Sequence, residues 1–127
     1  MKAYTDLEQS KVLSKILPLE SADMHYFDST PYCKYIEEDR DYWGINHEYI
    51  PAWSLASLLS ILPNNEHIDT TISRGSWKID TIEYMPNTWW CEYEDTKNPA
   101  EYFNTSADNP VDACVDMIIK LHERKML

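Results

Sequence analysis

The chain is poor in glycine, and this scarcity excludes one common kind of site. Only two of its 127 residues are glycine, Gly44 and Gly75. Loops that cradle phosphate groups need several glycines, because the backbone must approach the ligand closely. A glycine-rich nucleotide-binding loop is therefore excluded, and most tight turns must be made by asparagine or aspartate.

Cysteine pairs and long apolar runs are also missing. The three cysteines, Cys33, Cys91 and Cys114, are widely spaced and form no CxxC pair, so neither a disulfide framework nor a zinc module is indicated. No apolar run approaches the roughly 20 residues of a membrane span, and the N-terminal MKAYTDLEQSK lacks the apolar core of a signal peptide. We therefore expect a reduced, cytoplasmic protein with no membrane contact.

Basic residues are few, and the negative charge is concentrated in two blocks. The chain has 11 basic and 22 acidic side chains, for a net charge of -11. Residues 20–48 hold two basic and eight acidic residues, and residues 79–116 hold one basic and nine acidic residues. Such blocks repel nucleic acid and anionic lipid, so the charge favours a protein partner with a basic surface.

The composition is that of a folded protein of one domain. Hydrophobic residues make up 43% of the chain and aromatic residues 13%, which argues against global disorder. A length of 127 residues is enough to bury a core without disulfides or metals. We expect a single domain over residues 1–127.

Three helices are predicted, over residues 5–17, 53–62 and 110–125. In the first, Thr5 and Glu8 have the spacing of a capping box and Pro18 ends the helix. The second carries leucines at i, i+3, i+4 and i+7 from Leu55. The third is the clearest, because Asn109 can cap it and Pro110 suits its first position.

The region between the second and third helices predicts strands. Ile68, Thr70 and Ile72 alternate with polar residues, and Arg74-Gly75 is predicted to be the tip of a hairpin. A second turn is expected at residues 85–87, followed by a strand over 89–94 and a further strand over 102–106. Short extended pieces are expected at 21–27 and 32–36. The fold class is therefore α+β, with an antiparallel sheet of three to four strands (about 67–106) packed against the three helices.

Three segments are similar to those of a known group of proteins: YTDLEQSKVLSKILPLESADM, PAWSLASLL and ADNPVDACVDMIIKLHE. The chain resembles a family of small uncharacterised proteins of Bacteroides-type gut bacteria and of their phages and mobile elements. The family has no assigned activity, so the resemblance implies a recurrent domain and supplies no site residues. It also implies a modulator of a host protein, encoded by a phage or a mobile element.

No catalytic or metal-binding pattern is found. The four histidines and the cysteines stand at no spacing typical of metal ligands, so no metal and no cofactor is expected. Cys91 and Cys114 fall at positions predicted to be buried, which does not suit a nucleophile. The carboxylates of residues 37–41 lack the spacing of a calcium loop. We expect a protein that is not an enzyme.

Aromatic residues next to carboxylates are the best candidates for a binding surface. Trp89 and Trp90 are adjacent in a predicted strand, so their rings must point to opposite faces. Exposed tryptophan and tyrosine are enriched at protein interfaces. The proposed contact set consists of the acidic loop and one of these rings: Glu37, Glu38, Asp39, Asp41, Tyr42, Trp43 and Trp90.

Three functions are compatible with these features. The first is a non-enzymatic, acidic protein-interaction module, one version of which imitates the charge of DNA. The second is a small-ligand binder or enzyme with an aromatic-lined pocket between sheet and helices. The third is a homo-oligomer that uses its aromatic patch as a self-interface.

Overall fold

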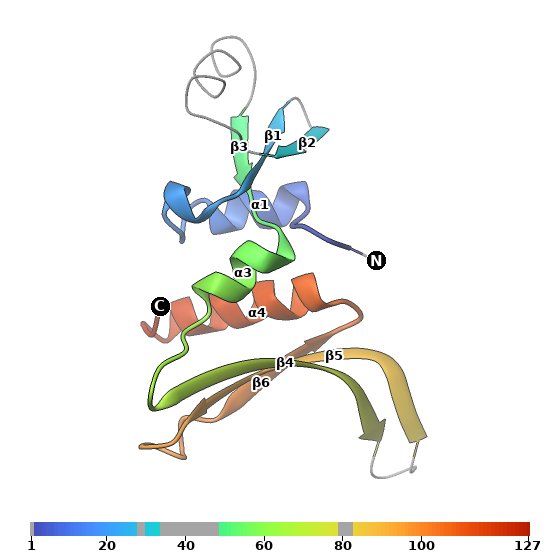
Figure 1. Ribbon diagram of the computed structural model, residues 1–127, viewed down its shortest axis with the longest axis vertical. Helices are drawn as coiled ribbons and strands as arrows, with labels where there is room; N and C mark the ends of the chain where they lie inside the picture. Colours follow the sequence, from blue (N-terminus) through green and yellow to red (C-terminus); the bar gives the residue numbers. More distant parts are fainter. Residues whose placement is uncertain (1, 28–29, 34–48, 79–82) are drawn as a thin grey trace. The chain divides into compact units, whose positions relative to one another are not determined.

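The computed structural model describes residues 2–27, 30–33, 49–78 and 83–127, which form two compact units (Figure 1). One unit is Ala3–Ile61, and the other consists of Met1–Lys2 and Leu62–Leu127. Each unit contains an antiparallel sheet and at least one helix, so the predicted α+β class is confirmed. That the two units fold together as one domain stays a prediction.

The unit Ala3–Ile61 is built on a small three-stranded sheet. Its elements are α1 (Leu7–Leu13), a 3-10 turn η1 (Leu19–Ser21), β1 (Met24–Phe27), β2 (Thr30–Cys33), β3 (Tyr49–Ala52) and α3 (Leu55–Ile61). The strand order is β2-β1-β3, and both pairs are antiparallel. Helix α1 contacts β3. The sequence predicted only extended pieces here, because the pairing of β1 with β3 joins segments more than 20 residues apart.

Helix α1 begins two residues later than predicted, and its cap differs. Asp6 is the N-cap, and its carboxylate accepts a 2.8 Å hydrogen bond from the backbone of Gln9. The Gln9 side chain accepts a 3.1 Å bond from the Asp6 backbone in return, which completes a capping box. The predicted Thr5–Glu8 box is therefore wrong, as is the predicted end near Leu17, since the helix stops at Leu13.

Thr5 instead joins three segments inside this unit. It is fully buried, and its hydroxyl accepts a 3.1 Å hydrogen bond from the Trp53 backbone and lies 2.8 Å from the Ser10 hydroxyl. Its carbonyl accepts a 2.8 Å bond from the Tyr26 hydroxyl. Buried polar groups must be paired, so these bonds fix the N-terminal segment against β1 and the segment before α3.

The second unit has one larger sheet covered by the C-terminal helix. Its elements are β4 (Ile68–Lys78), β5 (Glu83–Asp95), β6 (Phe103–Ala107) and α4 (Pro110–Glu123). The strands are antiparallel in the order β4-β5-β6, which confirms a meander in this region. Helix α4 contacts β5 and β6, and in Figure 1 it lies along one face of their sheet.

Helix α4 agrees closely with its prediction. The Asn109 side chain accepts a 2.8 Å hydrogen bond from the Asp112 backbone, and Pro110 takes the first turn, where no N–H donor is needed. The Lys2 ammonium forms a 2.7 Å ion pair with Asp112. The buried side of the helix consists of Pro110, Val111, Ala113, Cys114, Val115, Met117, Ile118 and Leu121.

The β4–β5 hairpin is longer than the sequence indicated. Arg74 pairs with Trp89 and Ser76 with Met85, so Gly75 faces three residues of β5 at a bulge. Gly75 has a positive φ of 87°, a conformation that suits glycine. The predicted tip at Arg74-Gly75 and the predicted turn at residues 85–87 are therefore both wrong. Glycine, proline and asparagine are all typical turn residues. Here, however, Gly75 of β4 lies opposite the Pro86 and Asn87 segment of β5 at an irregular point of one ladder.

None of the helices in the described part of the chain is both long enough and apolar enough to cross a bilayer. The predicted helix over 53–62 is present in shortened form as α3, and the predicted final strand is present as β6.

Candidate binding site on the open sheet face

The β4–β5–β6 sheet has one face under α4 and one face without a covering element among the described residues of its unit. Cys91, Tyr93 and Phe103 are buried and lie on the side of α4. Strand alternation places the intervening residues on the other side. We call this second side the open face, and it contains Asp69, Thr71, Ser73, Trp90, Glu92, Glu94, Asn104 and Ser106.

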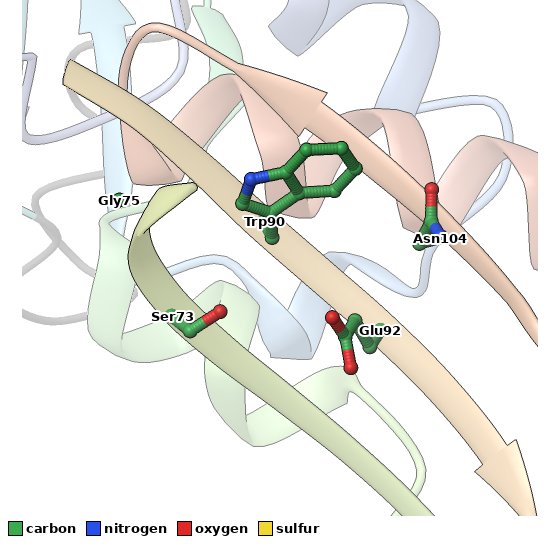
Figure 2. A pocket seen from close by; sticks show the side chains of 5 residues that line it. All are labelled: Ser73, Gly75, Trp90, Glu92 and Asn104. Carbon is green, nitrogen blue, oxygen red and sulfur yellow. The ribbon is translucent and has the colours of Figure 1, made fainter. Parts of the chain in front are cut away.

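A shallow pocket of about 240 Å³ lies on the open face. Figure 2 shows the five residues that line it: Ser73 and Gly75 from β4, Trp90 and Glu92 from β5, and Asn104 from β6. Ser73 is directly opposite Trp90, and Asn104 is directly opposite Glu92. Opposed residues have Cβ atoms about 5 Å apart, so the four side chains border one small space.

Trp90 offers the pocket its ring rather than its polar atom. The residue is half-buried, yet its Nε1 atom is buried and has no hydrogen-bond partner among the described residues. The exposed part of the side chain therefore consists of ring carbons. A flat apolar surface of this kind suits stacking against another planar or cationic group.

The open face carries carboxylates without cations. Asp69, Glu92 and Glu94 form no ion pair or side-chain hydrogen bond within the described residues. Asp69 and Glu94 are directly opposite each other in the ladder, an arrangement that destabilises a sheet. Among the described residues, the face therefore has an unbalanced negative charge: Glu92 lies beside Trp90, and the Asp69–Glu94 pair lies further along the same strands.

Arg74 lies in sequence between the pocket residues Ser73 and Gly75, but its side chain makes its contacts on the other side of the sheet. Arg74 pairs with Trp89 in the ladder, so both side chains lie on the face opposite Trp90. The Arg74 guanidinium is 5.8 Å from the Trp89 ring centroid, and its Nε donates a 3.0 Å hydrogen bond to the Pro86 carbonyl. It does not neutralise the open face.

The side under α4 gives the open face a rigid backing. The rings of Tyr93 and Phe103 stack with centroids 4.7 Å apart, and the Arg124 guanidinium lies 4.6 Å from the Phe103 centroid. Burial is the main cause that raises the pKa of Tyr93. Cys91 is fully buried, and a hydrogen bond with Cys114, together with burial, strongly raises the pKa of its thiol. Cys91, Tyr93 and Phe103 are therefore core residues, and Arg124 covers the edge of this core from the C-terminal end of α4.

The predicted contact set is only partly placed. Its acidic-loop members, Glu37, Glu38, Asp39, Asp41, Tyr42 and Trp43, lie outside the described residues. Trp90 is described, on the open face and at the pocket. The predicted contact set did not include Ser73, Gly75 or Asn104. Glu92 was predicted to point away from the core, but not to form part of a site. Alternation predicts that Trp90 and Glu92 share a face, whereas Ser73 and Asn104 join them only through strand register.

Within the described ranges, no group of three or more histidine, cysteine or acidic side chains is arranged to hold a metal ion. Comparisons of the chain with protein-family models, with curated proteins and with solved structures give no significant match.

Proposed function

We propose that this protein is a binding module that recognises a basic segment of a partner protein with the open face of its β4–β5–β6 sheet. The observation that carries the proposal is the half-buried Trp90 ring beside Glu92, on a sheet face whose other carboxylates, Asp69 and Glu94, have no cation partner among the described residues. The resemblance to proteins of phages and mobile elements makes a host protein the partner that we propose first.

Electrostatics supports a basic partner. The chain has a net charge of -11, and Asp69, Glu92 and Glu94 concentrate part of this charge on one sheet face. A positively charged segment would be attracted at long range and would relieve the repulsion between Asp69 and Glu94. Binding of this kind weakens as salt increases, because exposed charges are screened beyond about 10 Å at 0.1 M ionic strength.

The size of the pocket favours a side chain as its occupant. Sites for drug-sized ligands usually have volumes of about 300–1,000 Å³, whereas this pocket has about 240 Å³. Its lining is mainly polar, with a single aromatic ring. This observation favours a protein partner over the second candidate, a binder of a free small molecule.

The test is an NMR titration of the ¹⁵N-labelled chain with a lysine- and arginine-rich peptide and with its glutamate-substituted counterpart. We expect shifts of the amides and indole of Trp90 and of the amides of Glu92 and Asn104 with the basic peptide alone, and weaker binding at high salt. Shifts confined to other parts of the chain, or no binding at low salt, would contradict the proposal.

A double variant on the open face is compared with a control variant on α4. Asp69→Asn with Glu94→Gln removes two charges from the open face and keeps side-chain shape, and it should weaken binding of the basic peptide. Glu123→Gln changes an exposed charge on α4, on the other side of the sheet, and should have little effect. Light scattering on the same samples separates partner binding from self-association. A dimer that buries Trp90 and excludes the peptide would support the homo-oligomer instead.

A further inference from the structure

We propose that the pocket of Ser73, Gly75, Trp90, Glu92 and Asn104 accepts one arginine side chain of the partner, and that it prefers arginine to lysine. This inference rests on the proposed function and adds the chemistry by which the open face selects its ligand.

The Trp90 ring is the first reason for arginine. Because its Nε1 atom is buried, the ring presents a carbon surface to the pocket. A guanidinium group is planar and weakly hydrated, so it stacks on an indole with little loss of solvation. A lysine ammonium is compact and strongly hydrated, and it gains less from the same surface. Among the described residues, the guanidinium groups of Arg74 over Trp89 and Arg124 over Phe103 use the same chemistry, with the Arg124 group closer to the Phe103 centroid (4.6 Å) than the Lys120 ammonium (5.2 Å).

The oxygen atoms around the ring are the second reason. Glu92 is on the same strand and face as Trp90, Asn104 is opposite Glu92, and Ser73 is opposite Trp90. Carboxylate, amide and hydroxyl oxygens therefore lie on three neighbouring strands around one space, as Figure 2 shows. A guanidinium has five N–H donors in one plane, whereas an ammonium has three donors on one atom. A guanidinium can donate in its plane to acceptors on several strands while its flat face stacks on the ring, a geometry that the tetrahedral ammonium matches less well.

Gly75 and the bulge are the third reason. The bulge places a residue without a side chain at one border of the pocket. A β-carbon at this position would occupy part of the space. The backbone φ of 87° at Gly75 also disfavours a residue with a side chain. The border is therefore free for the aliphatic stem of an incoming side chain.

Charge separates arginine from a sugar. A tryptophan ring flanked by amide and carboxylate groups also suits a neutral saccharide. However, Asp69, Glu92 and Glu94 lie on the same face with no cation partner in the described ranges, and a neutral ligand would leave their charge unbalanced. The cationic ligand is the one that the electrostatics favours.

The experiment uses three nonapeptides of identical glycine, serine and lysine composition that differ only at the central position. This position is arginine, lysine or citrulline, the last being a neutral isostere of arginine. Dissociation constants are measured by calorimetry with the full chain. We expect the arginine peptide to bind about fivefold more tightly than the lysine peptide, and the citrulline peptide to bind most weakly.

Variants assign the preference to the pocket. Glu92→Gln and Trp90→Leu should each reduce the arginine-to-lysine preference to about onefold. Glu94→Gln is the matched control, because it removes the same charge from the same strand and face outside the pocket lining. It should weaken both peptides by a similar factor and keep the preference. Trp90→Phe serves in addition if the leucine variant does not fold, and it should retain part of the preference.

The outcomes separate the two proposals. Equal binding of the arginine and lysine peptides at the open face would overturn the arginine pocket and leave the basic-partner proposal standing. Absence of binding by every peptide at low salt would overturn both. Binding of a neutral oligosaccharide, with Trp90 shifted and no peptide bound, would replace both with a saccharide site.

Discussion

Asp69 and Glu94 are directly opposite each other on the open face of the β4–β5 ladder, and no cation pairs with either of them in the described parts of the chain. Two like charges in this position raise the free energy of the folded sheet. The sheet thus keeps an unfavourable pair on the same face as the Trp90 pocket. A basic partner would be attracted to both carboxylates and would reduce the repulsion between them.

The first prediction concerns this pair. Asp69→Asn should raise the free energy of unfolding by roughly 0.2–1 kcal/mol, because it removes the repulsion with Glu94. The same change should weaken binding of a basic peptide. Urea denaturation and a peptide titration measure the two effects. Glu66→Gln, at an exposed residue outside the strands, is the control and should change neither. A destabilised Asp69→Asn variant would argue against unrelieved repulsion.

The second prediction concerns the stack beneath the sheet. Phe103→Leu should lower the free energy of unfolding by about 1–3 kcal/mol, because it removes the stack with Tyr93 and the cation contact with Arg124. Tyr102→Leu, at a neighbouring ring that is 49% exposed, should change stability by less than about 0.5 kcal/mol. Both values come from urea denaturation. Similar losses in the two variants would show that the stack does not matter.

The third prediction concerns the buried hydroxyl of Thr5. Thr5→Val keeps the shape but leaves the Trp53 N–H without its acceptor, and should cost roughly 1–3 kcal/mol. Thr5→Ser keeps the hydroxyl and should cost less. Thermal and urea unfolding measure the difference. If valine and serine were equivalent, the hydrogen bonds of Thr5 would not be what fixes this segment.

The fourth prediction concerns pH. Desolvation and, next, the charge of Asp112 raise the pKa of Asp116 above 3.8, while Lys2 acts in the opposite direction. The folded state therefore holds this proton more tightly than the unfolded state does. The contribution of Asp116 to stability must fall as pH rises from 3.8 through the folded-state pKa, and the penalty is complete above it.

Asp116→Asn should remove that penalty. The variant should be more stable than the parent at neutral pH, and the two should converge as pH falls below 3.8. Urea unfolding over this pH range measures the effect. Glu123→Gln, at an exposed acid near the other end of α4, is the control for the removal of one negative charge. A parent that is more stable than Asp116→Asn at neutral pH would contradict the prediction.

Local signals in the sequence were sufficient for α4 and for the faces of β5. Asn109 and Pro110 determine where α4 begins through contacts within one turn, so the chain can be interpreted there without its fold. Alternation likewise placed Cys91 and Tyr93 in the core and Glu92 away from it, because a period of two is a property of the strand alone.

Features that depend on distant partners could not be predicted. The spacing of Thr5 and Glu8 predicted a helix cap. In the structure the Thr5 hydroxyl accepts a hydrogen bond from the backbone of Trp53, far along the chain, and Asp6 is the N-cap. Arg74-Gly75 looked like a tip, but the register with β5 makes it a bulge. The pocket was missed for the same reason, since Ser73 and Asn104 reach it from different strands and only strand pairing brings them together.

The bulge at Gly75 also divides the long hairpin into two parts with different mechanical support. Strand β6 pairs with β5 only over Trp89–Tyr93, whereas the β4–β5 ladder continues beyond the bulge to Lys78 and Glu83. A two-stranded ribbon is marginal in water without a third strand or a covering helix. The pocket lies where the three-stranded part of the sheet passes into the two-stranded part, so Trp90 has a strand partner on both sides whereas the Gly75 border lies at the irregular end of the ladder.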